Sequence, residues 1–154
     1  MRLIVLSLLV ALATPSPTSA DGLVHPEREA LLDFMNAHRQ RRGLPRLKLN
    51  DKLTAAAEDR IRDMFDRRYF DHVAPDGTLP YVWVRRRGYD YARIGENLAT
   101  GQRSAQEVVD QWMRSRGHRA TLLGKYEDTG IAVAEGSPTG RARGYTVVAL
   151  YARE

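Results

Sequence analysis

The chain has 154 residues, of which 43% are hydrophobic and 28% are charged, and none is cysteine. This length fits one domain, and the lack of cysteine excludes disulfides, thiolate zinc sites, iron–sulfur clusters and cysteine nucleophiles. The formal net charge is +5, and all but three of the 24 basic residues are arginine. Because acidic residues are interspersed among them, we interpret this excess as a general surface property and not as a phosphate-binding patch.

Residues 1–20 are typical of a secretory signal peptide. Arg2 precedes an apolar run from Leu3 to Ala13, and small residues lead up to Ala20. The run is shorter than the roughly 20 residues of a membrane-spanning helix, although an uncleaved N-terminal anchor is the alternative. We therefore expect cleavage near Ala20, with the product secreted or held in the periplasm or cell envelope. Residues 21–26 then form a short leader, and residues 27–154 form the folded domain.

Two helices are predicted at the start of the domain. Pro26 opens the first, because its missing N–H costs nothing in a first turn, and Gly43 ends it. Asn50 or Asp51 caps the second, whose apolar stripe has helical spacing and fades near residues 67–68.

The middle of the chain alternates short elements with turns. Thr78 follows a Pro-Asp-Gly turn and is predicted to cap a helix over residues 79–87. Residues 91–99 are predicted as a strand or an extended loop. A capping box at residues 104–107 begins a further helix, and an interruption at residues 117–118 precedes a short helix that ends at Leu123.

The last third of the chain has strand periodicity. Residues 130–134 are a short β-prone run, and residues 144–152 alternate and are rich in Tyr and Val. These two segments are predicted to pair as an antiparallel hairpin. Helices followed by strands indicate the α+β class.

Three residues are candidates for metal chemistry. His72 lies beside a predicted turn, Glu96 lies in a mostly apolar segment where a carboxylate needs a partner, and His118 follows Gly117. Two imidazoles and one carboxylate suit a divalent cation such as zinc, with a position open for water. The three residues are far apart in the sequence, so their spacing is equally compatible with scattered structural histidines.

Several segments together resemble the bacterial branch of the CAP superfamily, also called SCP-like domains. The resemblance covers the chain from about Glu29 to Tyr151. It is carried by Tyr69-Phe70-Asp71-His72 with Pro75-Asp76-Gly77, Gly88-Tyr89-Asp90-Tyr91, Gly95-Glu96-Asn97-Leu98-Ala99, and Val109 and Trp112 with Ser115-Arg116-Gly117-His118-Arg119.

This resemblance implies a three-layer α-β-α sandwich with a small central antiparallel sheet. It also implies that His72, Glu96 and His118 line one cleft as ligands of a divalent cation. Glu96 is the candidate catalytic residue if a reaction occurs. Further residues expected to line the cleft are Asp71, Asn97 and Ser115.

The chain departs from the wider family at one acidic position. Family members often place a second acidic residue in the cleft. In this chain that position is Ser115, and a serine is a poor zinc ligand and cannot act as a general base by itself. Glu107 is an alternative acid, but its position in the capping box favours a structural role. Asp71 is expected either to orient an imidazole or to be solvated.

Two functions remain open at this point. The first is a secreted binding module whose cleft holds a divalent cation and takes a lipid, glycan, peptide or protein ligand. The second is a metal-assisted hydrolase acting on a peptide, ester or cell-wall component. The missing second acid favours the binding module over the hydrolase. In addition, fold resemblance alone does not establish a catalytic activity. We further expect a monomer that is associated with the cell envelope and does not bind nucleic acid.

Overall fold

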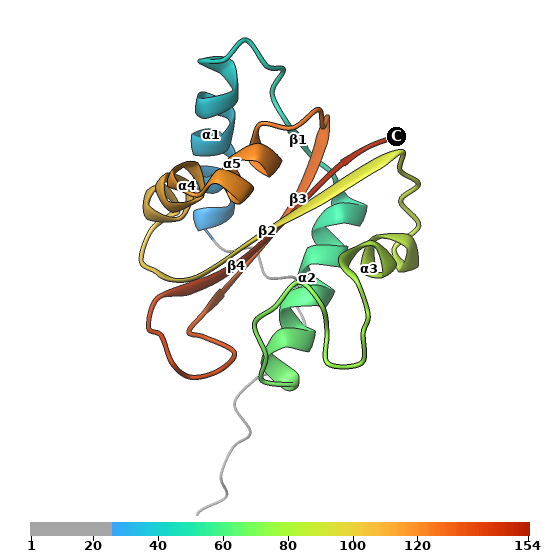
Figure 1. Cartoon of the computed structure of the whole chain (residues 1–154), viewed down its shortest axis with the longest axis vertical. Coiled ribbons are helices and arrows are strands. Elements are labelled where there is room, and N and C mark those ends of the chain that lie inside the picture. The colour runs from blue at the N-terminus through green and yellow to red at the C-terminus, as the bar shows by residue number, and fades with distance from the viewer. Residues whose placement is uncertain (1–25) are drawn as a thin grey trace, which may run out of the picture.

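Alternating strand residues and amphipathic helices place the apolar side chains on two faces of one sheet. Helices lie on both sides of that sheet (Figure 1). The structure is a computed structural model that describes residues 26–154. The predicted signal peptide, its cleavage site and the leader up to residue 25 lie outside the described residues. Within the described part, no helix has the length and apolar character needed to cross a membrane.

The elements, in chain order, are α1 (Glu27–Gln40), β1 (Lys48–Leu49), α2 (Asp51–Asp66), α3 (Pro80–Arg86), β2 (Arg93–Gln102), α4 (Ala105–Arg114), α5 (Arg116–Leu122), β3 (Asp128–Glu135) and β4 (Tyr145–Arg153). The four strands have the order β1-β3-β4-β2 in the sheet. The predicted hairpin is confirmed, because β3 pairs with β4 in antiparallel fashion. The segment predicted as strand or loop is a strand, β2, antiparallel to β4.

One strand was not predicted. The two residues of β1 pair with β3 in parallel, so the sheet is mixed and not wholly antiparallel. Lys48 and Leu49 are both exposed, and a two-residue segment of this kind has no alternation by which it could be found in the sequence.

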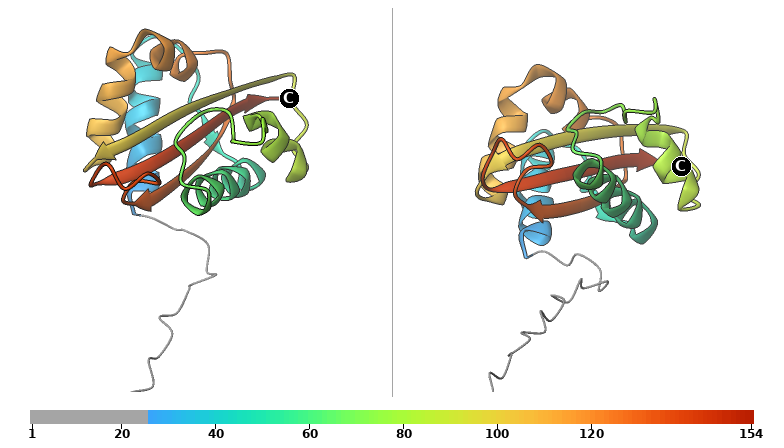
Figure 2. Two further views of the ribbon diagram at one scale, coloured as in Figure 1. Left: turned by 60° about the horizontal axis from the view of Figure 1, so that its bottom comes forward. Right: turned by 90° about the horizontal axis from the view of Figure 1, so that it is seen from below.

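The two faces of the sheet carry separate cores, as a three-layer sandwich requires. Val147 and Ala149 of β4 pack with α1, α4 and α5, whereas Val148 and Leu150 pack with α2 and α3. Successive strand residues point to opposite faces, so one strand supplies both cores. The sheet lies between the two helical layers (Figure 2).

Two helix starts differ in how well the capping pattern predicted them. Asn50 caps α2, since its Oδ1 accepts from the N–H groups of Lys52 at 3.0 Å and Leu53 at 3.2 Å. Thr78 does not cap α3, which begins at Pro80 with Leu79 at the N-cap. The N–H of Thr78 instead donates to Asp76 at 2.9 Å, so this residue belongs to the preceding turn.

The break between the last two helices comes earlier than predicted. It falls at Ser115, and α5 begins at Arg116, so Gly117 and His118 lie inside its first turn. This places the His118 side chain on a helix and not on a connecting loop.

A buried arginine fixes the end of α5. Arg39 of α1 is fully buried and donates to four backbone carbonyls at 2.9–3.0 Å. They belong to Pro45, Leu122, Gly124 and Tyr126. Because a guanidinium has five N–H donors in one plane, a single side chain ties α1 to the loop after α5, and so helps to position the helix that carries His118.

Candidate functional site

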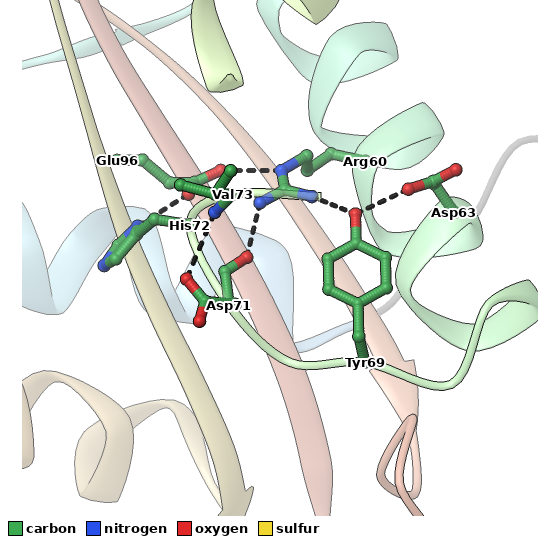
Figure 3. A network of polar contacts seen from close by, with 7 residues as sticks. All are labelled: Arg60, Asp63, Tyr69, Asp71, His72, Val73 and Glu96. Atoms are coloured by element: carbon green, nitrogen blue, oxygen red, sulfur yellow. Dashed lines mark hydrogen bonds and ion pairs between the residues drawn. The ribbon is translucent and has the colours of Figure 1, made fainter. Parts of the chain in front are cut away.

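A chain of polar contacts leads from the interior of the domain to His72 (Figure 3). Glu96 of β2 has a side chain only 3% exposed, and its Oε1 lies 2.7 Å from Nδ1 of His72. Its Oε2 accepts from Nε of Arg60 at 3.2 Å. The carboxylate therefore has a buried cation on one side and a half-exposed imidazole on the other.

Arg60 is a site residue that sequence reasoning missed. It also donates to the hydroxyl of Tyr69 and, at 2.5 Å, to the carbonyl of Asp71, so it ties the loop after α2 to that helix. Tyr69 in turn donates to Asp63 at 2.5 Å. A signal was present in the sequence: residue 60 falls on the buried face of α2 with Ile61, where an arginine needs partners.

His118 is supported from the opposite face of β2. Asn97, the neighbour of Glu96, is fully buried and donates to the His118 carbonyl at 3.0 Å and to the Tyr151 hydroxyl at 3.2 Å. Adjacent strand residues point to opposite faces, so Glu96 and Asn97 reach the two histidines from the two sides of the same strand.

Both histidines open onto a cleft of about 360 Å³ at the edge of β2. The residues that line it are Phe70, Asp71, His72, Leu98, Ala99, Thr100, Gln111 and His118. Asp71 lines the cleft, whereas Asn97 is buried beneath it and Ser115 is not among the lining residues.

The acidic residues near the cleft have separate tasks. Asp71 accepts from the N–H of Val73 at 3.1 Å, so it closes a turn, and Glu96 is the carboxylate that orients the imidazole of His72. Glu107 receives the N–H of Arg103 at 2.9 Å at the start of α4. Its own N–H donates to the hydroxyl of Ser104, the cap of that helix, at 3.2 Å, so Glu107 has the structural role that its position in the sequence favoured.

The two imidazoles have opposite pKa shifts. The hydrogen bond that His72 donates to the Glu96 carboxylate raises the pKa of His72 above its ordinary value of 6.5, against the effect of burial. Burial lowers the pKa of His118, and the charge of nearby His72 lowers it further. Near neutral pH, His118 is therefore the more readily available neutral imidazole.

We expect His72 to stabilise the fold in a pH-dependent way. Its pKa is raised in the folded state, so its contribution is fully present below the unfolded value of 6.5 and is lost as the pH rises through the folded value. The difference in Tm between the metal-free parent and His72→Gln, followed from about pH 5 to pH 9, should be largest at the acidic end. A difference that grows toward alkaline pH would contradict the assignment. His38→Gln is the control, since burial lowers the pKa of His38.

The donor atoms offer a partial set for a cation. Nδ1 of His72 is engaged, which leaves Nε2, and Nδ1 of His118 is buried with no hydrogen-bond partner among the described residues. Both oxygens of Glu96 already accept hydrogen bonds. In residues 26–154, no three His, Asp or Glu side chains lie in an arrangement that could hold a metal ion. Ligation by His72, Glu96 and His118 together thus stays a prediction, and it requires Glu96 to turn away from a present partner.

The comparison with known families matches most of the chain. Residues 32–151 match the model of the family described as the cysteine-rich secretory protein family, CAP. The protein YkwD of Bacillus subtilis (strain 168) is 37% identical over 110 residues, which cover 71% of this chain and 43% of YkwD. The chain thus spans less than half the length of this relative.

Solved structures share the fold. An extracellular protein containing an SCP domain from Bacillus anthracis superposes with a TM-score of 0.71 at 23% identity, over 82% of this chain and 40% of that one. An outer surface protein of Borrelia burgdorferi also gives 0.71, at 21% identity, over 83% of this chain and 93% of that one. At such identities the likeness concerns the fold.

Proposed function

Because the chain belongs to the CAP family of cysteine-rich secretory proteins, we propose that it is an extracellular binding module whose ligand occupies the cleft at His72 and His118. The observation that carries this proposal is the buried Arg60–Glu96 pair behind His72. Burying two charges is costly, and here the buried carboxylate has its remaining contact with a half-exposed imidazole in a cleft. Such an arrangement is typical of a site built for binding or chemistry.

A divalent cation such as zinc would be coordinated by the two imidazoles of this cleft. Nδ1–H of His72 donates to Glu96, which directs the other ring nitrogen outward, and a carboxylate behind a histidine raises its basicity as a ligand. Glu96 supports the site in this geometry, and becomes a third ligand only if it leaves Arg60 or His72. The cation would shape the cleft and polarise a ligand oxygen.

Zinc titration tests this proposal. We expect the parent to bind zinc, and the double variant His72→Ala, His118→Ala to lose binding, as measured by calorimetry. Glu96→Gln should weaken binding by about 10–100-fold, the usual effect of removing the group that orients a ligating histidine. Binding should also weaken as the pH falls, because protonated imidazole cannot ligate.

The control for this titration is His38→Ala, on α1, which should bind like the parent. Equal binding by the parent and the double variant would refute the cation site.

A metal-assisted hydrolase is the second candidate, and the 2.7 Å contact between His72 and Glu96 favours it. A carboxylate that orients an imidazole is an arrangement used in proton transfer. Mixed peptide and ester substrates, tested with zinc present, decide the question. Turnover by the parent that is lost in Glu96→Gln would favour the enzyme, and a lack of turnover together with zinc binding would favour the module.

The location and assembly belong to the same proposal. Similar solved structures are of an extracellular protein and of an outer surface protein, which supports export of this chain. We propose that it acts as a monomer at the cell envelope and does not bind nucleic acid. Fractionation of the native host and sedimentation of the purified protein test these points.

A further inference from the structure

The outer edge of β2 is unpaired within the part of the chain that the structure describes. β2 is the last strand of the sheet and pairs only with β4 there. An edge strand presents a row of N–H and C=O groups that can pair with another extended chain. The cleft at His72 lies along this edge.

The bonding pattern shows which residues of β2 face outward. In β4, the carbonyl of Arg153 accepts from the N–H of Ala92, which directly precedes β2. The carbonyl of the neighbouring Ala152 accepts instead from the N–H of Glu127, which directly precedes β3. Backbone groups alternate between the two neighbours of an antiparallel strand, so the odd-numbered residues of β4 face β2. Between Arg93 and Ala99, before the register shift that follows Thr100, their register partners on β2 are odd-numbered too, including Gly95 opposite Tyr151. The outward residues are therefore Ile94, Glu96, Leu98 and Thr100.

Side chains of this protein cap part of that edge. The carbonyl of Leu98 accepts from Nε1 of Trp112 at 3.0 Å, and that of Ile94 accepts from the Tyr126 hydroxyl at 3.4 Å. No hydrogen bond to the outward backbone groups of Glu96 or Thr100 is formed by residues 26–154. These two residues leave both a donor and an acceptor for a partner.

Two hollows lie end to end along the edge, with His72 between them. Leu98, Ala99 and Thr100 line the cleft described above, and residues 94–96 line a second hollow of about 300 Å³. His72 lines both. The stretch from residue 94 to residue 100 spans roughly 20 Å at about 3.3 Å per residue, which suits a short extended segment.

The second hollow is apolar on its outer side. It is lined there by Leu79, Pro80 and Tyr81, and the side chains of Leu79 and Tyr81 are 38% and 39% exposed. Val73, next to His72, is 44% exposed. The other large apolar residue with comparable exposure in the described part is Leu49, on the opposite edge of the sheet.

Exposed arginines adjoin the residues of the two hollows along the chain, and we call them the rim arginines. Arg93 adjoins Ile94, Arg116 and Arg119 flank His118 within two positions, and all three are exposed. Arg85 stacks over the ring of Tyr81 at 5.7 Å. Glu96 adds no free negative charge because Arg60 pairs with it, which leaves Asp71 as the acidic side chain on the lining. This charge is complementary to an acidic partner.

We propose that the ligand of the cleft is an extended, acidic polypeptide segment that adds a strand to the outer edge of β2. Its backbone pairs with Glu96 and Thr100, an apolar side chain enters the hollow beside Leu79, and acidic side chains face the rim arginines. Strand addition obtains affinity from main-chain hydrogen bonds and specificity from pockets for alternate side chains. The inference rests on the proposed function, because it names the occupant of the same cleft.

The test uses a pool of end-blocked heptapeptides with a central leucine, a glutamate at each end and random residues elsewhere. The pool is passed over the immobilised full chain, and the most enriched sequence is synthesised with a fluorophore. Binding of this peptide is then measured by anisotropy. We expect Leu79→Asp to weaken binding by about tenfold or more and Leu49→Asp, a change of equal exposure on the other edge, to leave it unchanged.

N-methylation of the peptide tests strand pairing directly. Methylating the alternate amides that face β2 should abolish binding, whereas methylating the intervening amides should preserve it. Failure to enrich any peptide, equal effects of the two methylation patterns, unchanged binding to Leu79→Asp, or binding of palmitate in place of the peptide would each overturn the proposal.

Failure here is separable from failure of the proposed function. Zinc binding is measured on the same Leu79→Asp protein and should equal that of the parent, since Leu79 supplies no ligand. If the parent protein binds zinc but no peptide, the proposed polypeptide ligand is refuted and the proposed cation site is not.

Discussion

Gly130→Ala is expected to destabilise the domain by more than about 4 kcal/mol, a large part of the roughly 5–15 kcal/mol that typically separates folded from unfolded protein. Gly130 is where β3 passes under the first turn of α2. A Cβ at this position would lie 2.0 Å from the carbonyl carbon and 2.2 Å from the carbonyl oxygen of Leu53, and 2.3 Å from the nitrogen of Thr54. These are backbone atoms, so no side-chain rotation relieves the overlap.

The first turn of α2 has little freedom to move away. Leu53 is fully buried, and the N–H of Asn50, the cap of the helix, donates to the carbonyl of Thr129 at 3.0 Å. Shifting the helix would open a cavity in the core on this face of the sheet. Such a cavity is destabilising, because protein interiors are normally close-packed.

Urea unfolding measures this effect, and Gly117→Ala is the matched control. Gly117 lies within α5, where a Cβ meets nothing within 4 Å. Alanine favours helix over glycine, so the control should be unchanged or more stable by up to about 1 kcal/mol. Similar unfolding midpoints for the two variants would contradict the close approach of β3 and α2.

Arg60→Met is expected to cost about 3–5 kcal/mol, the usual effect of removing one partner of a buried ion pair. The side chains of Arg60 and Glu96 are 0% and 3% exposed, so solvent cannot replace the lost charge. The same change removes the donor that holds the carbonyl of Asp71, and so loosens the loop that carries His72.

The pair can be tested as a unit. The double variant Arg60→Met, Glu96→Gln should recover part of the lost stability, because it no longer buries an unpaired carboxylate. Arg62→Met is the control on the same helix, since that side chain is 52% exposed and its ion pair with Asp59 is a surface pair. The control should change stability by less than about 1 kcal/mol. A loss in Arg60→Met no greater than in Arg62→Met would contradict the buried pair.

Local sequence signals predicted the elements because local forces determine them. The helical spacing of apolar residues and the cap at Asn50 located α2, and the alternation of residues 144–152 located β4. Where prediction failed, a non-local or competing interaction decided. Asp76 holds Thr78 in a turn, and β1 exists because its two residues meet β3.

Sequence reasoning selected the imidazoles and the carboxylate of the candidate site, and missed the arginine that supports them. His72, Glu96 and His118 could be selected by chemistry and by resemblance to a family, although their spacing was uninformative. Arg60 was overlooked because an arginine in a helix is ordinarily solvated, and only its position on the buried face of α2 distinguished it.

The sequence by itself determined the α+β class, most element positions and a short list of candidate cation ligands, since these follow from periodicity and side-chain chemistry. Only the tertiary structure decided that Glu96 and Asn97 approach His72 and His118 from opposite faces of β2, and that the cleft runs along a strand edge with no partner strand in residues 26–154. Those features depend on strand order and on contacts between residues more than 20 positions apart. The free energy that selects them comes from packing both faces of the sheet, which no local pattern of residues records.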